Sequence, residues 1–576
     1  MTLVRRVTRS RSAPWTLPVS VGILASLLAS GISFLRLPVP QVHDEFSYLL
    51  AADTFASGRL TNPPHPMWPY FETFHVLQQP SYASKYPPAQ GALLALGKVV
   101  AGSPTVALWL GMGLAAAAVT WALRGWMPSR WSLLGGLLVA LHGNLHVLWG
   151  QTYWGGNVAF IGGALLMGAY PRLVRHGHFR DACWLGIGLM ILANSRPYEG
   201  LAVSLPVAGA ILSRYFGPRR PPWAATFRMA SALGLTLGIT SFGMAYYNAR
   251  ITGQAGTLPY MAYERMYSQT PLFLWQQPRP AVAHRNNIMR HFCSTFERAA
   301  FARQRTPSGY LKSKLHFLLI AWHYLLGISW TLALIFASDL LVRRRWRLPI
   351  AMVLMSLLAV AGTTWSNTNY LAPTVAPLVL AVVLGIRRLR VLTWRRPARR
   401  STVARGLVLS HVPAFILFVS VYLAGPASEF ALTRARILDD LGRTSGQHLV
   451  LVRYHPDHDV RCEWVYNDAD IDAARVVWGR SFGGDADRRL REYFGDRRIW
   501  LLEADETPPR IRPYPSVARP ESAHVAPREG NRTTRRGAAD GAGCMHELEH
   551  SAYCATSPQR TDASLQRQAK RASSRD

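Results

Sequence analysis

The sequence contains few cysteines, few lysines and few acidic residues. Its 576 residues include five cysteines, which form no Cys-x-x-Cys pair and no zinc-ligand spacing. This argues against a zinc-ribbon or thioredoxin-like protein. Cys544 and Cys554 flank His546 and His550 in the C-terminal region. A disulfide, a metal site and an unstructured tail all agree with that arrangement.

Lysine is scarce among the basic residues, so the positive charge is almost entirely arginine. There are 64 Lys and Arg against 32 Asp and Glu, which gives a formal net charge of +32. In a soluble protein this charge would indicate nucleic-acid binding. Here many arginines lie in short loops between apolar blocks, and others follow Glu503 in a polar tail. We therefore attribute the charge to membrane topology and expect no nucleic-acid partner.

What the sequence does contain is a series of apolar blocks, most of them close to the 20 residues that a helix needs to cross a bilayer. This excludes a purely soluble enzyme, a disordered chain and an outer-membrane barrel, whose strands would be short and alternating. A further apolar stretch, 87–101, begins with two prolines and is predicted to be a helix at the membrane surface, with a re-entrant segment as the alternative. The predicted spans are 15–36, 104–123, 131–149, 156–171, 182–194, 198–214, 228–247, 315–342, 348–364, 370–387 and 405–424. The predicted fold class is an α-helical polytopic membrane protein with about 11 transmembrane helices.

The arginines of the short loops predict the orientation, because cytoplasmic loops are rich in Arg and Lys. Arginines precede the first block, which places the N-terminus in the cytoplasm. Alternate loops are then basic, whereas the short loops on the other side carry only Arg196. An odd number of crossings places the C-terminal part outside the cytoplasmic (inner) membrane. The basic loops are 124–130, 172–181, 215–227, 343–347 and 388–404.

Three long segments are thereby predicted to lie together on the outer side: 37–86, 248–314 and the chain after 425. We divide the chain into a transmembrane domain, 1–425, a small extracytoplasmic α/β domain, 426–506, and a disordered tail, 507–576. In the second domain, short Val-, Trp- and Leu-rich runs at 448–454, 463–467, 474–479 and 498–504 are typical of β-strands, and 427–444 and 486–495 are expected to be helices. The domain has no Gly-x-Gly-x-x-Gly motif, so nucleotide binding is unsupported.

Two motifs in segment 37–86 contain the residues that are candidates for catalysis and substrate binding. Asp44 and Glu45 begin a helical pattern, where two acids can simply stabilise the helix start. Alternatively, a carboxylate there acts as a general base, or the pair holds a metal ion. Lys85 stands before Pro87 and Pro88, where it is either a snorkelling interfacial lysine or a contact for a lipid phosphate.

The N-terminal crossing, the Asp44-Glu45 pair leading an Ala-rich helix and the Lys-Tyr-Pro-Pro motif at 85–88 resemble the GT-C glycosyltransferases. The similarity covers about residues 1–425 and is greatest to the branch of protein O-mannosyltransferases and the lipid A aminoarabinose transferase. Members take a sugar from a polyprenyl-phosphate donor and transfer it on the outer face of the membrane. The resemblance implies that Asp44 is the catalytic base, that Glu45 lies beside it and that Lys85 contacts the donor phosphate.

Other outer loops agree with this resemblance. Trp154 lies in a tight turn and is either an interface anchor or a platform for a sugar ring. Arg196 and Glu199 interrupt an apolar run and form either a salt bridge or contacts to phosphate and sugar. Asn369 and Tyr370 lie in an Asn-Tyr-x-x-Pro sequence similar to the family's Arg/His-Tyr-x-x-Pro element, with Asn369 in place of the basic residue.

The long segment 248–314 completes the predicted site, because loops of this length are usually functional. Arg265 and Arg285 are candidates for pairing with the phosphate, or belong to a basic belt at the lipid surface. Aromatic residues are expected to line the sugar site. The aromatic candidates, some of them outside this segment, are Tyr48, Tyr86, Trp154, Tyr263 and Tyr370.

The sequence therefore predicts an inverting membrane glycosyltransferase that uses a polyprenyl-phosphate sugar as donor. The acceptor is a glycolipid, a polysaccharide or a protein. No cofactor is required by this mechanism and no metal ligand is assigned, although a divalent metal is compatible with it. Two alternatives remain: an oligosaccharyltransferase or polymerase with a diphosphate-linked donor, and a non-catalytic flippase or transporter. The polar residues of the outer loops favour an enzyme, because transporters usually place such groups within the membrane.

Overall fold

The computed structural model describes residues 15–218, 220–337, 343–391 and 397–515. The arginines before residue 15 and the Cys544–Cys554 segment lie outside the described residues. So does most of the region predicted to be a disordered tail.

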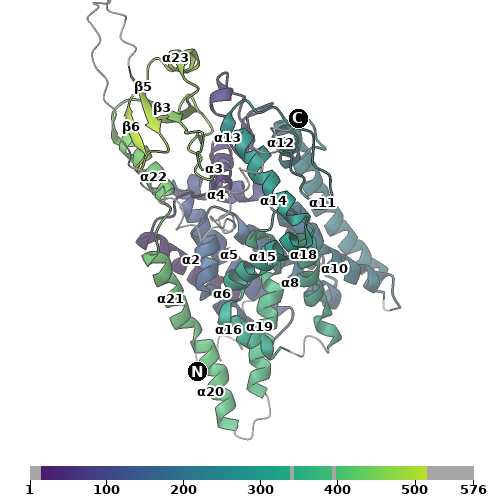
Figure 1. Cartoon of the computed structure of the whole chain (residues 1–576). Coiled ribbons are helices and arrows are strands. Elements are labelled where there is room, and N and C mark those ends of the chain that lie inside the picture. Colours follow the sequence, from purple (N-terminus) through teal and green to yellow (C-terminus); the bar gives the residue numbers. More distant parts are fainter. Residues whose placement is uncertain (1–14, 219, 338–342, 392–396, 516–576) are drawn as a thin grey trace, which may run out of the picture.

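A bundle of apolar helices forms the larger part of the molecule (Figure 1). In the described residues, six helical segments are long and apolar enough to cross a membrane, or eight if each of two bent helix pairs counts as one span. The predicted count of eleven is not confirmed. The six segments are α2 (Thr16–Leu35), α5 (Thr105–Arg124), α8 (Gly156–His176), α11 (Trp223–Thr252), Thr368–Val391, which ends in α19 (Val375–Val391), and Thr402–Ala424, which ends in α21 (His411–Ala424).

Three of the other predicted spans are helices that are shorter or less apolar than a membrane crossing needs: α9 (Phe179–Ala193), α10 (Pro197–Tyr215) and α18 (Arg347–Ala361). The remaining two predicted spans are bent. The helix α6 (Ser129–Ala140) is followed at 56° by Gly143–Gly150. The helix α15 (Pro307–Leu325) turns by 93° into α16 (Gly327–Ile335). Gly327 has a φ of 58°, a left-handed conformation that glycine adopts without steric cost, and this allows the chain to bend within the predicted span 315–342.

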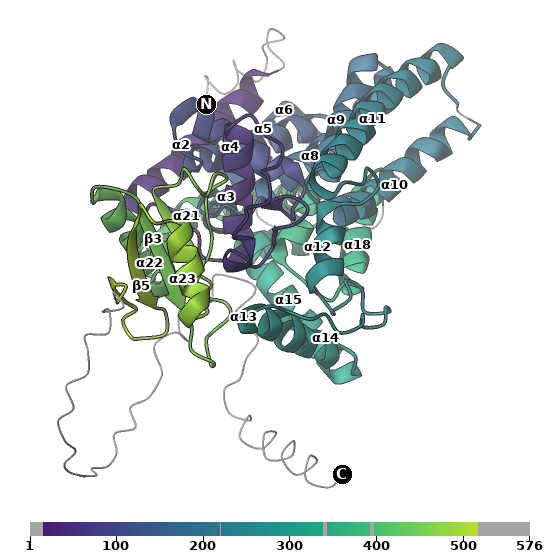
Figure 2. The ribbon, with the colours of Figure 1, turned by 90° about the horizontal axis from the view of Figure 1, so that it is seen from above.

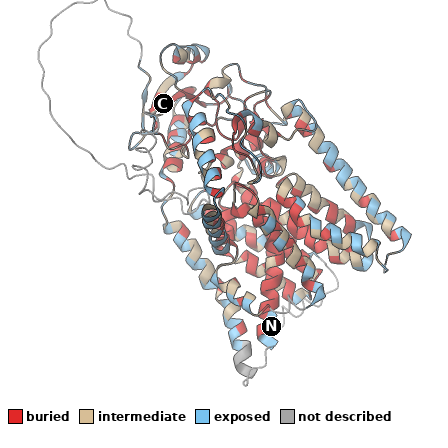
Figure 3. Cartoon of the chain, turned by 45° about the vertical axis from the view of Figure 1, so that its right-hand side comes forward, coloured by how far each residue is buried: buried red, intermediate tan, exposed pale blue. Residues whose placement is uncertain are grey.

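The centre of the bundle is closely packed. A Cβ atom on Gly22 of α2 would lie 2.8 Å from the Gly113 carbonyl of α5, so small residues let these two backbones approach each other. The helices α8 and α19 are largely buried, whereas α11 and α21 are exposed over most of their length (Figure 3). Exposed apolar helices of this kind are suited to contact lipid.

The polar segments gather at one end of the bundle (Figures 1 and 2). We call this region the cap and define it as residues 37–86, 253–306 and 425–515. Its first part contains α3 (His43–Ala56) and a short hairpin, β1 (Val76–Leu77) and β2 (Ala83–Ser84), after which α4 (Pro88–Ala101) lies beside α3. Its second part contains α12 (Pro259–Tyr267), α13 (Asn287–Arg290) and α14 (Glu297–Gln304).

The third part of the cap contains a four-stranded sheet. The strands are β3 (His448–Arg453), β4 (Val476–Arg480), β5 (Arg498–Glu503) and β6 (Arg510–Pro513), in the order β4-β3-β5-β6. The first three are parallel and β6 is antiparallel to β5. The helices α22 (Glu429–Arg443) and α23 (Gly484–Tyr493) agree with the two predicted helices.

Two sequence predictions in this part are wrong. Residues 463–467 form no strand, because the Glu463 carboxylate is buried and accepts hydrogen bonds from Tyr454 and from the backbone of Val465, which hold the segment as a loop. Residues 510–513 lie in the range predicted to be disordered but form β6, whose backbone pairs with β5.

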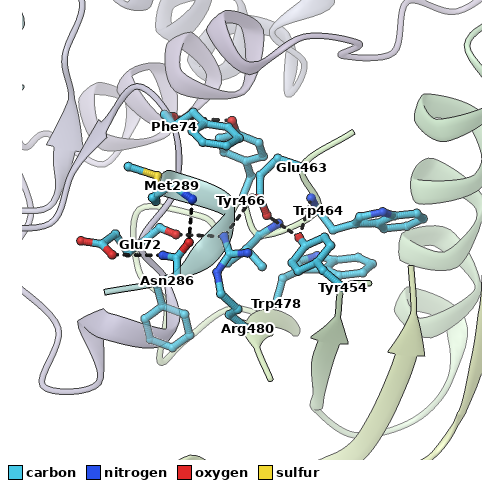
Figure 4. Close-up of polar contacts among 12 residues, drawn as sticks. Glu72, Phe74, Asn286, Met289, Tyr454, Glu463, Trp464, Tyr466, Trp478 and Arg480 are labelled. Atoms are coloured by element: carbon cyan, nitrogen blue, oxygen red, sulfur yellow. Dashed lines mark hydrogen bonds and ion pairs between the residues drawn. The ribbon is translucent and has the colours of Figure 1, made fainter. Parts of the chain in front are cut away.

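Buried polar contacts join the three parts of the cap (Figure 4). The Arg480 guanidinium is 2.8 Å from the Glu463 carboxylate and also donates to the Glu72 carbonyl. The Glu72 carboxylate in turn accepts a hydrogen bond from Asn286. Since these residues come from all three parts, the network fixes the first segment of the cap against the other two.

Candidate active site

A cavity of about 290 Å³ is lined by residues of both the cap and the bundle. It is bounded by the start of α3, the Lys85–Pro88 turn, the turn before α10, α12 and the segment before α19. The structure brings seven of the predicted site residues into its lining: Asp44, Lys85, Tyr86, Trp154, Arg196, Glu199 and Tyr370.

Asp44 lies in the first turn of α3, with its side chain 13% exposed. The Tyr86 hydroxyl donates a hydrogen bond to one Asp44 oxygen at 2.5 Å, and the His75 Nε2 atom is 3.9 Å from the other. The Tyr86 ring stacks on Tyr48 at 4.6 Å between centroids. The carboxylate is therefore held in a defined position at the wall of the cavity.

Glu45 does not line the cavity. Its carboxylate accepts hydrogen bonds from the backbone N–H groups of Gln41, Val42 and Tyr153. Burial raises the pKa of Glu45 to about 7, although these hydrogen bonds oppose the shift. Glu45 thus caps the N-terminus of α3 and connects it, through the Tyr153 N–H, to the turn that carries Trp154.

His75 lines the cavity and was not identified from the sequence. It has a φ of 62°, and its carbonyl accepts hydrogen bonds from the Ser47 hydroxyl and the Lys85 N–H. Burial, with the positive charge of Lys85, holds the pKa of His75 well below its ordinary value. A neutral imidazole therefore lies beside Asp44. A lone histidine in a polar segment gives no sequence signal for this role.

Lys85 is 3% exposed and lies in a cage of charged and aromatic groups. Its Nζ atom is 3.1 Å from the Glu264 carboxylate. The rings of Tyr260 and Tyr263 each lie 4.5 Å from Nζ, a distance at which aromatic faces attract a cation. The predicted residue Tyr263 thus packs against Lys85 and does not line the cavity itself.

Arg196 precedes α10 and contributes a second cation to the cavity. Its guanidinium lies 5.1 Å from the centre of the Tyr370 ring. Burial opposes the charge, but Tyr48 and Glu199 outweigh it and raise the pKa of Arg196 above its ordinary value. Among the described residues, no carboxylate forms an ion pair within 4 Å of Arg196.

Four other predicted residues do not line the cavity; one of them, Tyr48, stacks on Tyr86 as described above. Arg265 is exposed on α12. Arg285 lies over the ring of Trp68 at 4.9 Å. Asn369 is fully buried and accepts a hydrogen bond from the Trp149 indole at 2.5 Å. In the described part of the chain, no group of three or more His, Cys, Asp or Glu residues could hold a metal ion.

A second cavity, of about 780 Å³, shares Trp365 and Asn367 with the first. It is formed by α14 and α15, and its lining includes Arg303, Lys312 and His316. The segment before α19 therefore contributes to the lining of both cavities.

The fold agrees with the GT-C fold that the sequence motifs led us to expect. The apo structure of ArnT from Cupriavidus metallidurans matches with a TM-score of 0.50 and 12% identity, over 88% of this chain and 94% of that one. ArnT, a lipid A aminoarabinose transferase, is thus a protein to which this chain is similar in fold.

Two further structures match less well. ArnT from Cupriavidus metallidurans bound to undecaprenyl phosphate gives a TM-score of 0.44 at 10% identity, over 84% of this chain and 94% of that one. The Archaeoglobus fulgidus oligosaccharyltransferase in complex with Zn and sulfate gives 0.43 at 11% identity. That match covers 75% of this chain, which spans only 60% of the length of the oligosaccharyltransferase. No protein-family model and no curated protein sequence matches the chain.

Proposed function

We propose that the chain is an integral-membrane glycosyltransferase that moves a sugar from a polyprenyl-phosphate donor to an acceptor. The observation that carries this proposal is the lining of one cavity by a carboxylate, Asp44, and two cations, Lys85 and Arg196. These groups match the two charge changes of the reaction. An acceptor hydroxyl or amine loses a proton, and a lipid phosphate leaves with the bonding electrons.

In the proposed reaction, Asp44 removes the proton from the acceptor as its oxygen or nitrogen attacks the anomeric carbon. The bond from that carbon to the phosphate oxygen breaks in the same displacement, so the anomeric configuration is inverted. Lys85 and Arg196 stabilise the negative charge on the departing lipid phosphate; electrostatic stabilisation of this kind is usually the largest part of catalysis. Tyr86 holds the Asp44 carboxylate in position.

The aromatic residues Trp154 and Tyr370 line the same cavity and provide faces against which a sugar ring can pack. Glu199 supplies a hydrogen-bond acceptor for its hydroxyl groups. We further propose that the cap faces the outer side of the cytoplasmic membrane, with the N-terminus inside. This orientation rests on the arginine-rich loops and agrees with the gathering of the polar segments at one end of the bundle.

Two measurements test the function. The purified chain should release polyprenyl phosphate from a polyprenyl-phosphate sugar when an acceptor extract is added. Cells lacking the gene should accumulate a polyprenyl-phosphate sugar and lose one glycan, and the chain carrying Asp44→Asn should not restore it. Accumulation of a diphosphate-linked sugar instead would contradict the proposed donor. Unchanged lipids and glycans would contradict the function.

A further inference from the structure

The buried ion pair of Lys85 and Glu264 has a consequence for ligand binding. The two residues are 179 positions apart in the chain, and both side chains are at most 5% exposed. Lys85 is nearly enclosed by Tyr86, Tyr260 and Tyr263. Because the Lys85 side chain is only 3% exposed and its ammonium group is paired with Glu264, a phosphate that binds Lys85 must compete with this carboxylate, and both residues line the cavity.

Glu264 has a second cation within reach. The Arg279 guanidinium donates a hydrogen bond to the Glu264 carbonyl at 2.5 Å and lies 3.9 Å from the Glu264 carboxylate. Arg279 therefore stands beside the Glu264 carboxylate as a second ion-pair partner. Glu264 can thus release Lys85 without becoming an unpaired buried charge, which would be costly.

We propose that Glu264 is a displaceable anion that competes with the lipid phosphate for Lys85, and that Arg279 holds Glu264 after the exchange. The inference rests on the proposed function and adds an affinity-determining residue to it. The neighbouring Glu297 carboxyl accepts a hydrogen bond from Ser268 and does not pair with Lys85. Burial, with the charge of Glu264, raises the pKa of Glu297 to about 8. It is therefore mostly neutral near pH 7, and the cluster of Lys85, Arg279 and Glu264 keeps one positive charge for an incoming anion.

The exchange also accounts for product release. Polyprenyl phosphate leaves the reaction with more negative charge than it had in the sugar phosphodiester, so it would bind Lys85 more tightly than the donor does. A carboxylate that returns to Lys85 weakens this product complex. Loss of Glu264 should therefore lower KM and kcat together, because product release would become the slow step.

The test measures binding of undecaprenyl phosphate to the full chain purified in detergent. Glu264→Gln removes the competing charge and keeps the size, so we expect about tenfold tighter binding than in the unmodified chain. The ligand-induced rise in Tm should increase accordingly. Arg279→Gln leaves Glu264 without its second partner, so we expect binding several-fold weaker.

Glu463→Gln is the matched control, because Glu463 forms an equally buried ion pair with Arg480 at 2.8 Å and does not line the cavity. We expect Glu463→Gln to lower Tm without changing the affinity for undecaprenyl phosphate. If Glu264→Gln does not fold, Glu264→Asp keeps the charge but withdraws it from Lys85, and should still bind more tightly than the unmodified chain. Equal or weaker binding by a folded Glu264 variant would overturn the exchange but not the proposed function. Absence of binding by every form, the unmodified chain included, would overturn both.

Discussion

The Asp44 carboxylate and the Tyr86 hydroxyl are 2.5 Å apart, although 42 positions separate the two residues in the chain. One begins the helix that follows the first span, and the other ends the polar segment that returns to the bundle. This contact joins the two ends of the segment 43–86 at the cavity wall. It gives the candidate base a fixed position in the cavity that Lys85 and Arg196 also line.

Replacing Asp44 by Asn should reduce kcat by about 100-fold or more, which is the usual contribution of general-base catalysis. The substitution keeps the size of the side chain and one acceptor oxygen for Tyr86, so Tm should change little. Turnover of a polyprenyl-phosphate sugar by the purified variant is the measurement. Near-normal turnover by a folded Asp44→Asn protein would refute the mechanism.

Replacing Tyr86 by Phe should lower kcat by about tenfold, because a hydrogen bond to a charged group contributes about 1.5–3 kcal/mol. The ring stack on Tyr48 is preserved, so the loss should appear in kcat more than in KM or Tm. Steady-state kinetics with a polyprenyl-phosphate sugar separate these quantities. A change confined to KM would show that Tyr86 binds substrate and does not position Asp44.

Replacing Glu45 by Gln should act on stability. An amide cannot accept all three backbone hydrogen bonds that the carboxylate accepts from Gln41, Val42 and Tyr153. We expect a loss of about 1–3 kcal/mol in the free energy of unfolding, seen as a lower Tm in detergent, with a smaller fall in kcat than for Asp44→Asn. A collapse of kcat at unchanged Tm would instead indicate that Glu45 takes part in the chemistry.

Binding of the lipid phosphate should weaken as the pH rises through about 8. Glu297 faces Lys85, Glu264, Arg279 and Cys293, and its pKa is raised to about 8 by burial and by Glu264. Below this pH the group is protonated and neutral. Above it, a new negative charge opposes the phosphate, so the affinity should fall by at most about tenfold per pH unit.

The measurement is the dissociation constant of undecaprenyl phosphate between pH 6 and pH 9.5. In Glu297→Gln, which cannot ionise at this position, the fall above pH 8 should disappear. If the variant keeps the same pH profile, another group is responsible.

Two truncations test the role of β6. A chain that stops after residue 515 keeps the pairing of β6 with β5 and the hydrogen bond from Tyr514 to Asp487. It should fold and remain active, in line with the sequence prediction for the tail. A chain that stops after Thr507 loses β6 and exposes the edge of β5, so its Tm should be lower. Equal Tm values would show that β6 contributes no stability.

The helical part of the fold could be read from the sequence because apolar blocks of membrane length have few alternatives to a helix. The bends in the helices could not be predicted from the sequence, because they depend on the backbone conformation of single residues such as the left-handed Gly327. The loop at 463–467 was mistaken for a strand because its residue types favour a strand. The buried carboxylate of Glu463 overrides that preference through Tyr454 and Arg480.

The candidate site was predictable in part for a similar reason. Asp44 and Lys85 stand next to local signals, a helix start and a proline pair, which mark them in the sequence. His75 and Glu264 reach the same cavity through contacts between distant segments, and nothing in their immediate neighbourhood indicates this. Arg265 and Arg285 were predicted to bind the phosphate, but they do not line the cavity. A basic segment does not indicate which of its side chains face inward.

The helix that carries Asp44 depends on the far end of the chain. Phe46 stacks on Tyr466 at 4.4 Å, and the His43 ring contacts the Arg461 carbonyl, 418 positions later. During translation, the ribosome must therefore make more than 400 further residues after α3 before these contacts can form. On the proposed function, the nascent chain should therefore transfer no sugar until residues 461–466 have been made and have docked against α3.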